Sequence, residues 1–242
     1  MLRVFYKGPF TAKMVIDDKE KYHHLAIVLR SKIGDEVYLV NDTEVAKTEI
    51  VAITKSTVEL QLLEQMPENN ELDCHITLGF GPLKGDNTQL VVQKAVELGA
   101  KHIDLINFKR NVSKFDSTKA QKKITKFEKI IEGACLQSRR NIVPTIAANV
   151  KLSASYLEGF DLVLVAYENE RSNHILKYQP EITKAKKILL LIGPEGGIAD
   201  DEIDLLSQFA NVKIATLGKR ILRAETASIS GMSIIDSILE GK

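Results

Sequence analysis

The stretch that decides the fold lies near the C-terminus, where ILLLIGPEGG spans residues 188–197 and LGKRILRAETA spans residues 217–227. The first begins with an uninterrupted apolar run, which is typical of a central strand buried on both faces. A second apolar segment, residues 212–216, precedes LGKRILRAETA. Ligands of open α/β sheets bind beyond the carboxyl ends of the strands, so we expect a small-molecule site between these two glycine-bearing loops.

Strands and helices alternate outward from this stretch. Apolar runs predict the strands, and apolar residues at helical spacing predict the helices. This alternation implies an α/β domain with a parallel sheet that is covered on both faces. The predicted strands are 76–80, 103–108, 162–166, 188–192 and 212–216, and the predicted helices are 86–98, 118–139, 201–209 and about 225–240. Gly99 is expected to end the first helix, and Asp200 or Asp201 to cap the third.

Residues 1 to about 70 have a different pattern and are expected to form a small β-barrel. Short segments at 36–41, 45–53 and 57–63 are rich in Val, Ile, Leu and Thr and are separated by turn residues. Apolar residues occupy both parities of 45–53, which favours a small barrel over a sheet with one buried face.

One segment of this N-terminal part is expected to be helical. Within residues 21–30, Leu25, Val28 and Leu29 lie at helical spacing. The polar stretch 66–73 contains a proline and is expected to separate two domains. The predicted domains are 1–70 and 74–242.

Composition narrows the class of protein. The chain has 242 residues, 44% of them hydrophobic, and a formal net charge of +1. Its two cysteines, Cys74 and Cys135, show no paired spacing, which favours a reducing compartment and argues against a disulfide framework or a cysteine zinc site. The start of the chain does not resemble a signal peptide, and no apolar run approaches the roughly 20 residues of a membrane span. We therefore expect a cytoplasmic protein with no membrane segment and, because the five histidines show no ligand spacing, no metal site.

Positive charge is concentrated in one segment. Residues 109–140 contain ten lysines and arginines but only three acidic residues. Such an excess can be the footprint of a polyanion, and it would make binding depend on salt. The lysines of residues 119–129 can equally be the solvated face of an amphipathic helix. That second interpretation fits Arg110 and the pair Arg139-Arg140 less well, because they lie at predicted element ends.

The two glycine loops do not match the common phosphate-binding motifs. No Gly-Lys-Ser/Thr follows residues 193–197, and the spacing is not that of a dinucleotide fingerprint. The acidic helix start that follows would also repel a pyrophosphate. In the second loop, Arg223 stands beside Glu225 and Thr226 at the entrance to the last helix. Arg223 can form a surface ion pair there while one of its neighbours caps the helix, or it can face residues 193–197 across the mouth of the crevice.

Several motifs together resemble one known family, the RsmE family of SPOUT-class (trefoil-knot) methyltransferases, which methylate N3 of a uridine in small-subunit ribosomal RNA. The likeness covers both predicted domains in order. The motifs are His24 with VLR at 28–30 and GD at 34–35, QKAVELG at 93–99, ACLQS at 134–138, RNIVP at 140–144, LLIGPEGGI at 190–198, DEI at 201–203 and LG-x-x-ILR-x-ETA at 217–227.

This chain departs from the family pattern after the long helix. The family motif there usually reads EQSGRNRVP, and Leu136, Arg139 and Ile142 replace its glutamate, its glycine and its second arginine. Lys84 stands near a position where arginine is common. These differences concern RNA contacts, whereas the motifs of the methyl-donor site are intact.

The resemblance implies a PUA-like RNA-binding β-barrel followed by a SPOUT trefoil-knot domain with a parallel sheet, which binds S-adenosylmethionine. It further implies a homodimer whose substrate is 16S rRNA within the small ribosomal subunit. The implied donor-binding residues are Ile192, Gly193, Pro194, Glu195, Gly196, Gly197, Leu217, Gly218, Leu222, Ala224 and Thr226, with the adenine among Leu217, Leu222 and Ala224. The implied RNA-binding residues are Arg30, Lys84, Arg110, Arg139 and Arg140.

Arg223 is the expected catalytic residue. Loss of the proton from uracil N3 leaves negative charge on O2 and O4, and a fixed guanidinium can stabilise that charge. Glu225 and Glu195 are both candidates for the general base, and both can instead have structural roles. Two other functions stay open, namely a SPOUT methyltransferase for another RNA base and a non-catalytic RNA-binding or ribosome-assembly protein.

Overall fold

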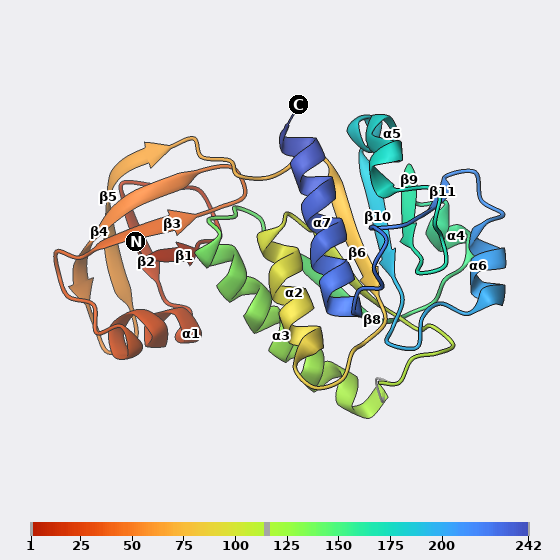
Figure 1. The fold of residues 1–242 in the computed structure, drawn as a ribbon. Coiled ribbons are helices and arrows are strands. Elements are labelled where there is room, and N and C mark those ends of the chain that lie inside the picture. Colours follow the sequence, from red (N-terminus) through yellow and green to blue (C-terminus); the bar gives the residue numbers. More distant parts are fainter. Residues whose placement is uncertain (1, 114–116, 242) are drawn as a thin grey trace. The chain divides into compact units, whose positions relative to one another are not determined.

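Figure 1 shows the protein as a computed structural model, which describes residues 2–113 and 117–241 and, among these, not the side chains of 117–120. The chain divides into two compact units. The first contains Met1–Glu71 together with Arg139–Ile142, and the second contains Leu72–Ser138 together with Val143–Lys242. The chain therefore returns to the first unit for a short segment after it has entered the second.

The first unit is built on a five-stranded curled sheet with the order β1-β3-β4-β5-β2. Only β1 and β3 run parallel, and the other neighbours are antiparallel. Its strands are β1 Arg3–Phe5, β2 Lys13–Ile16, β3 Glu36–Val40, β4 Val45–Ile53 and β5 Val58–Met66. The curl confirms a small β unit, and the sheet is a half-barrel with β1 and β2 at its edges rather than a closed barrel.

The predicted helix in this unit consists of two different helices. A short helix, α1 (Lys19–Tyr22), continues into a π-helix at His23–Val28. Leu25 is buried in the core of the curled sheet, whereas Val28 is 57% and Leu29 45% exposed. The wider turn of a π-helix changes which side chains share a face, so α-helical spacing did not predict the buried set.

The second unit contains a six-stranded sheet with the order β11-β9-β10-β6-β7-β8, in which every pair is parallel. The prediction of a parallel sheet with the 188–192 strand at its centre is confirmed, because this strand pairs on one side with β6 and on the other with β9. The strands are β6 His75–Phe80, β7 His102–Ile106, β8 Thr145–Val150, β9 Leu162–Ala166, β10 Lys187–Ile192 and β11 Val212–Ala215. The edge strand β8 was not predicted.

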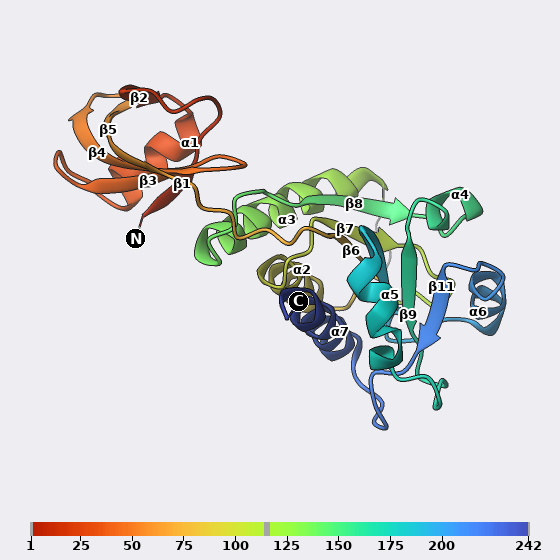
Figure 2. The ribbon, with the colours of Figure 1, turned by 90° about the horizontal axis from the view of Figure 1, so that it is seen from above.

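Helices cover both faces of this sheet, as Figure 2 shows. Leu189 and Leu191 of β10 pack in a core with Leu157 and Leu206 from the helices of one face. Leu190 points the other way, where a Cβ added to Gly231 would lie 2.8 Å from its Cδ2. The helices are α2 Asn87–Glu97, α3 Ser117–Gln137, α4 Ala154–Leu157, α5 Gln179–Lys184, α6 Asp200–Leu206 and α7 Ala224–Glu240, with a 3-10 helix at Ile175–Tyr178.

The helix ends agree only partly with the sequence signals. Gly99 follows α2 with φ +83°, a left-handed conformation that favours glycine, so the predicted stop is confirmed. The N-cap of α6 is Ala199, and the predicted caps Asp200 and Asp201 are wrong, because both lie inside the first helical turn. Among the described residues, no helix combines the length and hydropathy that a membrane span requires.

A buried carboxylate fastens the edge of the second sheet. Asp104 of β7 is only 3% exposed, and its Oδ2 accepts a 2.6 Å hydrogen bond from the hydroxyl of Tyr156. Its Oδ1 lies 3.0 Å from Nε2 of His102, whose Nδ1 lies 2.5 Å from Oγ1 of Thr145 in β8. Burial and the bond to Asp104 raise the pKa of Tyr156 above its ordinary value, so the phenol is the donor. The network thereby joins α4, β7 and β8.

Tyr156→Phe is expected to destabilise the protein by about 1–3 kcal/mol, because a buried carboxylate oxygen loses its donor. The aromatic packing is retained, since the ring stacks edge-on against Phe160 with centroids 5.4 Å apart. Urea unfolding followed by circular dichroism measures the change. Tyr178→Phe is the matched control, because no described residue makes a hydrogen bond to that hydroxyl. Equal stability of the two variants would contradict the role of the Asp104 network.

Candidate functional site

A cavity of about 600 Å³ lies at the carboxyl ends of β9, β10 and β11 in the second unit. Four loops line it, those that follow β6, β9, β10 and β11, and the last two are the glycine-bearing loops on which the sequence analysis is centred. All residues implied to bind the methyl donor line the cavity except Gly196 and Thr226. The lining residues are Lys84, Asn87, Ala166, Tyr167, Glu168, Ile192, Gly193, Pro194, Glu195, Gly197, Thr216, Leu217, Gly218, Arg220, Ile221, Leu222, Arg223, Ala224, Glu225 and Ala227.

The first glycine loop is a tight turn that leaves no room for side chains. The N–H of Gly197 donates to the carbonyl of Pro194 at 2.9 Å, and Gly197 has φ +71°. A Cβ added to Gly193 would lie 2.8 Å from Cγ1 of Ile198, and one added to Gly197 would collide with the carboxylate of Glu168. The loop therefore presents backbone rather than side chains at these positions.

The second loop is closed by a threonine. The hydroxyl of Thr216 donates to the carbonyl of Gly218 at 2.9 Å and lies 3.2 Å from its N–H. Gly218 itself has φ +137°, which a side chain rarely permits. This arrangement turns the chain sharply at the end of β11 and directs Leu217 and Leu222 along the cavity wall.

Among the lining residues that sequence reasoning did not assign to the site, three come from a loop that it did not consider. Ala166, Tyr167 and Glu168 follow the predicted strand at 162–166, so a signal existed in their position after a strand. Because β9 lies between β10 and β11, its end contributes to the same cavity. That neighbourhood depends on the order of strands in the sheet, which the linear sequence does not contain.

The two candidates for the general base differ in their contacts. Oε1 of Glu195 accepts a 2.8 Å hydrogen bond from the backbone N–H of Lys84, so this carboxylate braces two loops. Glu225 lies in the first turn of α7, lines the cavity and makes no side-chain hydrogen bond or ion pair with the described residues. Of the two, Glu225 is the one with no structural partner among the described contacts.

Arg223 lines the cavity at the N-cap position of α7. It is exposed, and α7 begins without a side-chain cap, so neither Glu225 nor Thr226 has the capping role that the sequence left open. The described residues also contain no ion pair between Arg223 and a carboxylate. Its guanidinium therefore stands at the mouth of the cavity without a protein partner in the described structure.

Of the residues implied to bind RNA, Lys84 lines the cavity and Arg110 contacts the first glycine loop and the residue that follows it. Lys84 is exposed. Arg110 follows β7, and its Nη1 donates to the carbonyl of Ile198, just after the first glycine loop, at 3.2 Å. Gly196 faces this arginine, since an added Cβ would lie 2.8 Å from the carbonyl oxygen of Arg110.

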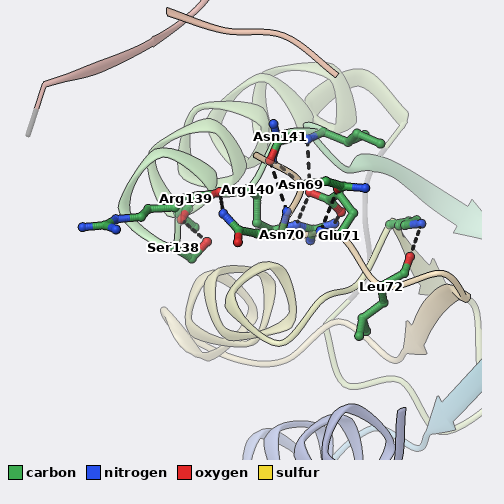
Figure 3. Close-up of polar contacts among 11 residues, drawn as sticks. Asn69, Asn70, Glu71, Leu72, Ser138, Arg139, Arg140 and Asn141 are labelled. Carbon is green, nitrogen blue, oxygen red and sulfur yellow. Dashed lines mark hydrogen bonds and ion pairs between the residues drawn. The ribbon is translucent and has the colours of Figure 1, made fainter. Parts of the chain in front are cut away.

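Arg140 has a structural role, which argues against the predicted contact with RNA. Its side chain is 3% exposed, and Nε and Nη2 donate to the carboxylate of Glu71 at 3.1 and 2.5 Å (Figure 3). Oε1 of Glu71 also accepts the backbone N–H groups of Asn141 and Ile142, at 3.0 and 3.1 Å. The arginine is thus committed to fastening the segment 139–142 to the linker within the first unit.

Arg139 differs from its neighbour. Its side chain is exposed and extends away from the cluster in Figure 3, while its carbonyl accepts a 2.9 Å bond from Nδ2 of Asn70. Its φ of +60° is unusual for a residue with a side chain. Arg30, the other implied RNA contact in the first unit, is also exposed and has φ +54°.

The lysine-rich segment is only partly described. Lys122 and Lys126 are exposed on α3, which agrees with either interpretation of this helix. Lys114 and the side chain of Lys119 lie outside the described residues. Within the described ranges, no group of three His, Cys, Asp or Glu side chains is placed to hold a metal ion.

Comparison with known proteins identifies the family. Residues 70–236 match the model of the RNA methyltransferase domain, and residues 16–63 match the model of the RNA methyltransferase PUA domain. The chain belongs to the RsmE family of RNA methyltransferases. Individual relatives support the assignment to RsmE over nearly the full chain.

Ribosomal RNA small subunit methyltransferase E of Bacillus subtilis is 33% identical over 223 residues, which cover 89% of this chain and 87% of the relative. Ribosomal RNA small subunit methyltransferase E 2 of Borreliella burgdorferi is 33% identical over 230 residues, covering 94% and 92%. The Neisseria gonorrhoeae enzyme of the same name, solved with bound S-adenosyl methionine, is 25% identical with a TM-score of 0.83 over 98% of both chains. This match confirms the predicted fold class of an RsmE protein, a PUA-like unit followed by a SPOUT-class α/β domain.

Proposed function

We propose that this chain transfers a methyl group from S-adenosylmethionine to N3 of a uridine in 16S rRNA. The observation that carries the proposal is the 600 Å³ cavity between the two glycine-bearing loops. It occurs in a chain whose full-length relatives are named small-subunit rRNA methyltransferases, one of them solved with S-adenosyl methionine bound.

The cavity fits the proposed donor in size and in chemistry. Its volume falls within the range of about 300–1,000 Å³ that is common for small-molecule sites. Gly193, Gly197 and Gly218 line the cavity without side chains, so their main-chain amides and carbonyls can hold a bent ligand. Leu217, Leu222 and Ala224 would surround the adenine, with Ile192, Pro194 and Glu195 on the facing loop. When bound, the donor supplies an electrophilic methyl group.

Positioning and charge stabilisation are the tasks left to the protein. Transfer from a sulfonium is an in-line displacement, so holding the acceptor in line supplies much of the rate. The exposed guanidinium of Arg223 would stabilise the charge on uracil O2 and O4 after N3 loses its proton. Glu225 is the proposed general base, because Glu195 is already engaged with the Lys84 backbone.

The RNA is proposed to contact both domains. We assign RNA binding to the PUA-like domain, residues 1–70, and catalysis to residues 74–242. Exposed arginines and lysines would bind phosphates without reading sequence, and the proposed contacts are Arg30, Lys84, Arg110 and Arg139. The substrate would be 16S rRNA within the small ribosomal subunit, and the protein would act in the cytoplasm.

A homodimer is also part of the proposal, and the sequence of the last helix contains an apolar stripe, Ile229, Met232, Ile235 and Leu239, that could contact a second copy or pack within the protomer. Met232, Ile235 and Leu239 of that stripe are buried within the protomer, so they form core rather than interface. Ile234 and Ile238 line a shallow groove on α7 and are the better candidates for contact with a second copy. Light scattering of the purified protein measures the assembly.

The test is methyl transfer from labelled S-adenosylmethionine to three acceptors: small subunits from a strain lacking this enzyme, naked 16S rRNA and transfer RNA. We expect label in the 16S rRNA, and N3-methyluridine when the modified nucleotide is identified by mass spectrometry. Label in transfer RNA or on another base would replace the proposed substrate. Failure to bind the donor in calorimetry, together with no transfer, would instead favour a non-catalytic RNA-binding or assembly protein.

A further inference from the structure

We propose that Glu202 is a positioning residue that holds the donor loop and the Arg110 loop in one arrangement, so that donor binding and RNA binding are coupled. The inference rests on the proposed function, because it takes residues 193–197 as the donor loop. Glu202 is the third residue of α6 and is 9% exposed. A charge so far from solvent requires partners, and its partners are informative.

Both oxygens of Glu202 accept backbone hydrogen bonds, and the two donors come from different loops. Oε2 accepts from the N–H of Ala199 at 3.0 Å, at the end of the loop that follows β10. Oε1 accepts from the N–H of Lys109 at 2.9 Å, in the loop that follows β7. The positive end of the α6 dipole further favours a carboxylate at this position. The side chain of Glu202 therefore links two loops whose donor residues, Lys109 and Ala199, are 90 positions apart in the sequence.

The same two loops also contact each other directly, so a change in the link through Glu202 would affect these contacts as well. The guanidinium of Arg110 donates to the carbonyl of Ile198, and Gly196 approaches the Arg110 backbone so closely that an added Cβ would lie 2.8 Å from its oxygen. Lys109 also forms an exposed ion pair with Asp201. A shift of either loop would disturb all of these contacts, since interlocked loops cannot move separately without a steric clash.

The link through Glu202 connects two surfaces with different proposed ligands. Gly193, Pro194 and Gly197 line the donor cavity, whereas neither Lys109 nor Arg110 is among its lining residues. Loss of this link should loosen the donor loop and, at the same time, free Arg110 from its orientation. Glu202 touches neither ligand in this arrangement, so its effect on both would be transmitted through the backbone.

Glu202→Gln is the test, because it keeps the shape of the side chain and one acceptor oxygen but turns an NH₂ group toward one of the two backbone N–H donors. We expect the Kd for S-adenosylmethionine, measured by calorimetry well below the Tm of the variant, to rise about tenfold, which corresponds to one charge-assisted hydrogen bond. The KM for RNA should rise in parallel. Asp204→Asn is the matched control, since Asp204 is an exposed carboxylate on the same helix that makes no side-chain hydrogen bond or ion pair with the described residues.

A purely structural role gives a different result. The Tm of Glu202→Gln would fall, but the folded variant would keep the wild-type Kd for the donor and the wild-type KM for RNA, and this outcome would overturn the inference. If the wild-type protein itself fails to bind S-adenosylmethionine, the proposed function fails rather than the role of Glu202.

A measurement on the unmodified protein covers the case in which the variant does not fold. Amide hydrogen exchange is followed at Lys109 and at Ala199 with and without S-adenosylmethionine. Donor binding is expected to slow exchange at Lys109, although that residue does not line the cavity. Slowing at Ala199 with no change at Lys109 would show that the loops are not coupled.

Discussion

Arg223→Ala is expected to lower kcat for methyl transfer by about two to three orders of magnitude, which is the usual effect of removing one preorganised donor to a developing negative charge. The guanidinium stands at the mouth of the cavity without an ion-pair partner in the described structure, so its charge is available to a substrate. The affinity for S-adenosylmethionine should change little, because the donor is proposed to bind mainly to backbone groups.

Single-turnover transfer and donor calorimetry separate these two effects. Arg223→Lys keeps the charge but not the planar fork, and we expect it to recover only part of the rate. Arg171→Ala is the matched control, because Arg171 is an exposed arginine that donates to the carbonyl of Lys219 at 3.4 Å without lining the cavity. Wild-type turnover in Arg223→Ala would remove Arg223 from the mechanism, and lost donor affinity would make it a donor-binding residue.

Arg140→Met is expected to destabilise the first unit by about 3–5 kcal/mol, because it leaves the carboxylate of Glu71 buried without its counter-charge. Both side chains are almost inaccessible, with 3% and 4% exposure. The double variant Glu71→Gln/Arg140→Met should lose less than the single one, since no buried charge is left unpaired. Chemical unfolding followed by a probe in the first unit measures both.

Glu36→Ala is the control for this experiment. It removes a partner of Lys47 from an ion pair that is open to solvent, and we expect a smaller change because water and salt screen that pair. Equal losses from the exposed and the buried pair would contradict the structural role assigned to Arg140.

The same pair makes the first unit sensitive to acid. Burial alone would raise the pKa of Glu71, but the hydrogen bonds and charge of Arg140, with the N–H groups of Ile142 and Asn141, outweigh it and hold the pKa below 4.5. A lowered pKa in the folded state contributes stability that is fully present above the unfolded value and is lost as the pH falls through the folded value. The wild-type protein should therefore lose this contribution below about pH 4.5, and Glu71→Gln should show a weaker dependence.

Local patterns predicted the central parts of the fold well. The apolar runs 162–166 and 188–192 are strands because continuous apolar sequence suits a parallel sheet with two covered faces. The edge strand β8 escaped prediction, since Thr145 and Asn149 interrupt its apolar pattern and Asn149 has φ +60°. Strands β1 and β2 span only three and four residues, too few for a periodic signal.

The site was predictable where its residues are adjacent in sequence and not where they meet through tertiary contacts. The loops after β10 and β11 could be identified because each follows an apolar strand, whereas Glu168 enters the cavity through the order of strands in the sheet. The structural role of Arg140 could not be predicted for the same reason. Its partner Glu71 lies 69 positions away in the sequence. An arginine in a basic segment with no acidic neighbour in the sequence resembles a phosphate contact.

The return of residues 139–142 to the first unit has a consequence for how such a protein can be inherited or engineered. A gene fragment that ends near codon 71 would encode the curled sheet but not Arg140, Asn141 and Ile142, which donate to Glu71. Recombination that exchanges the N-terminal part alone would therefore combine Glu71 from one parent with residues 139–142 from the other. Successful chimaeras should be those in which both segments come from the same parent, so the two regions are expected to be inherited as a single unit.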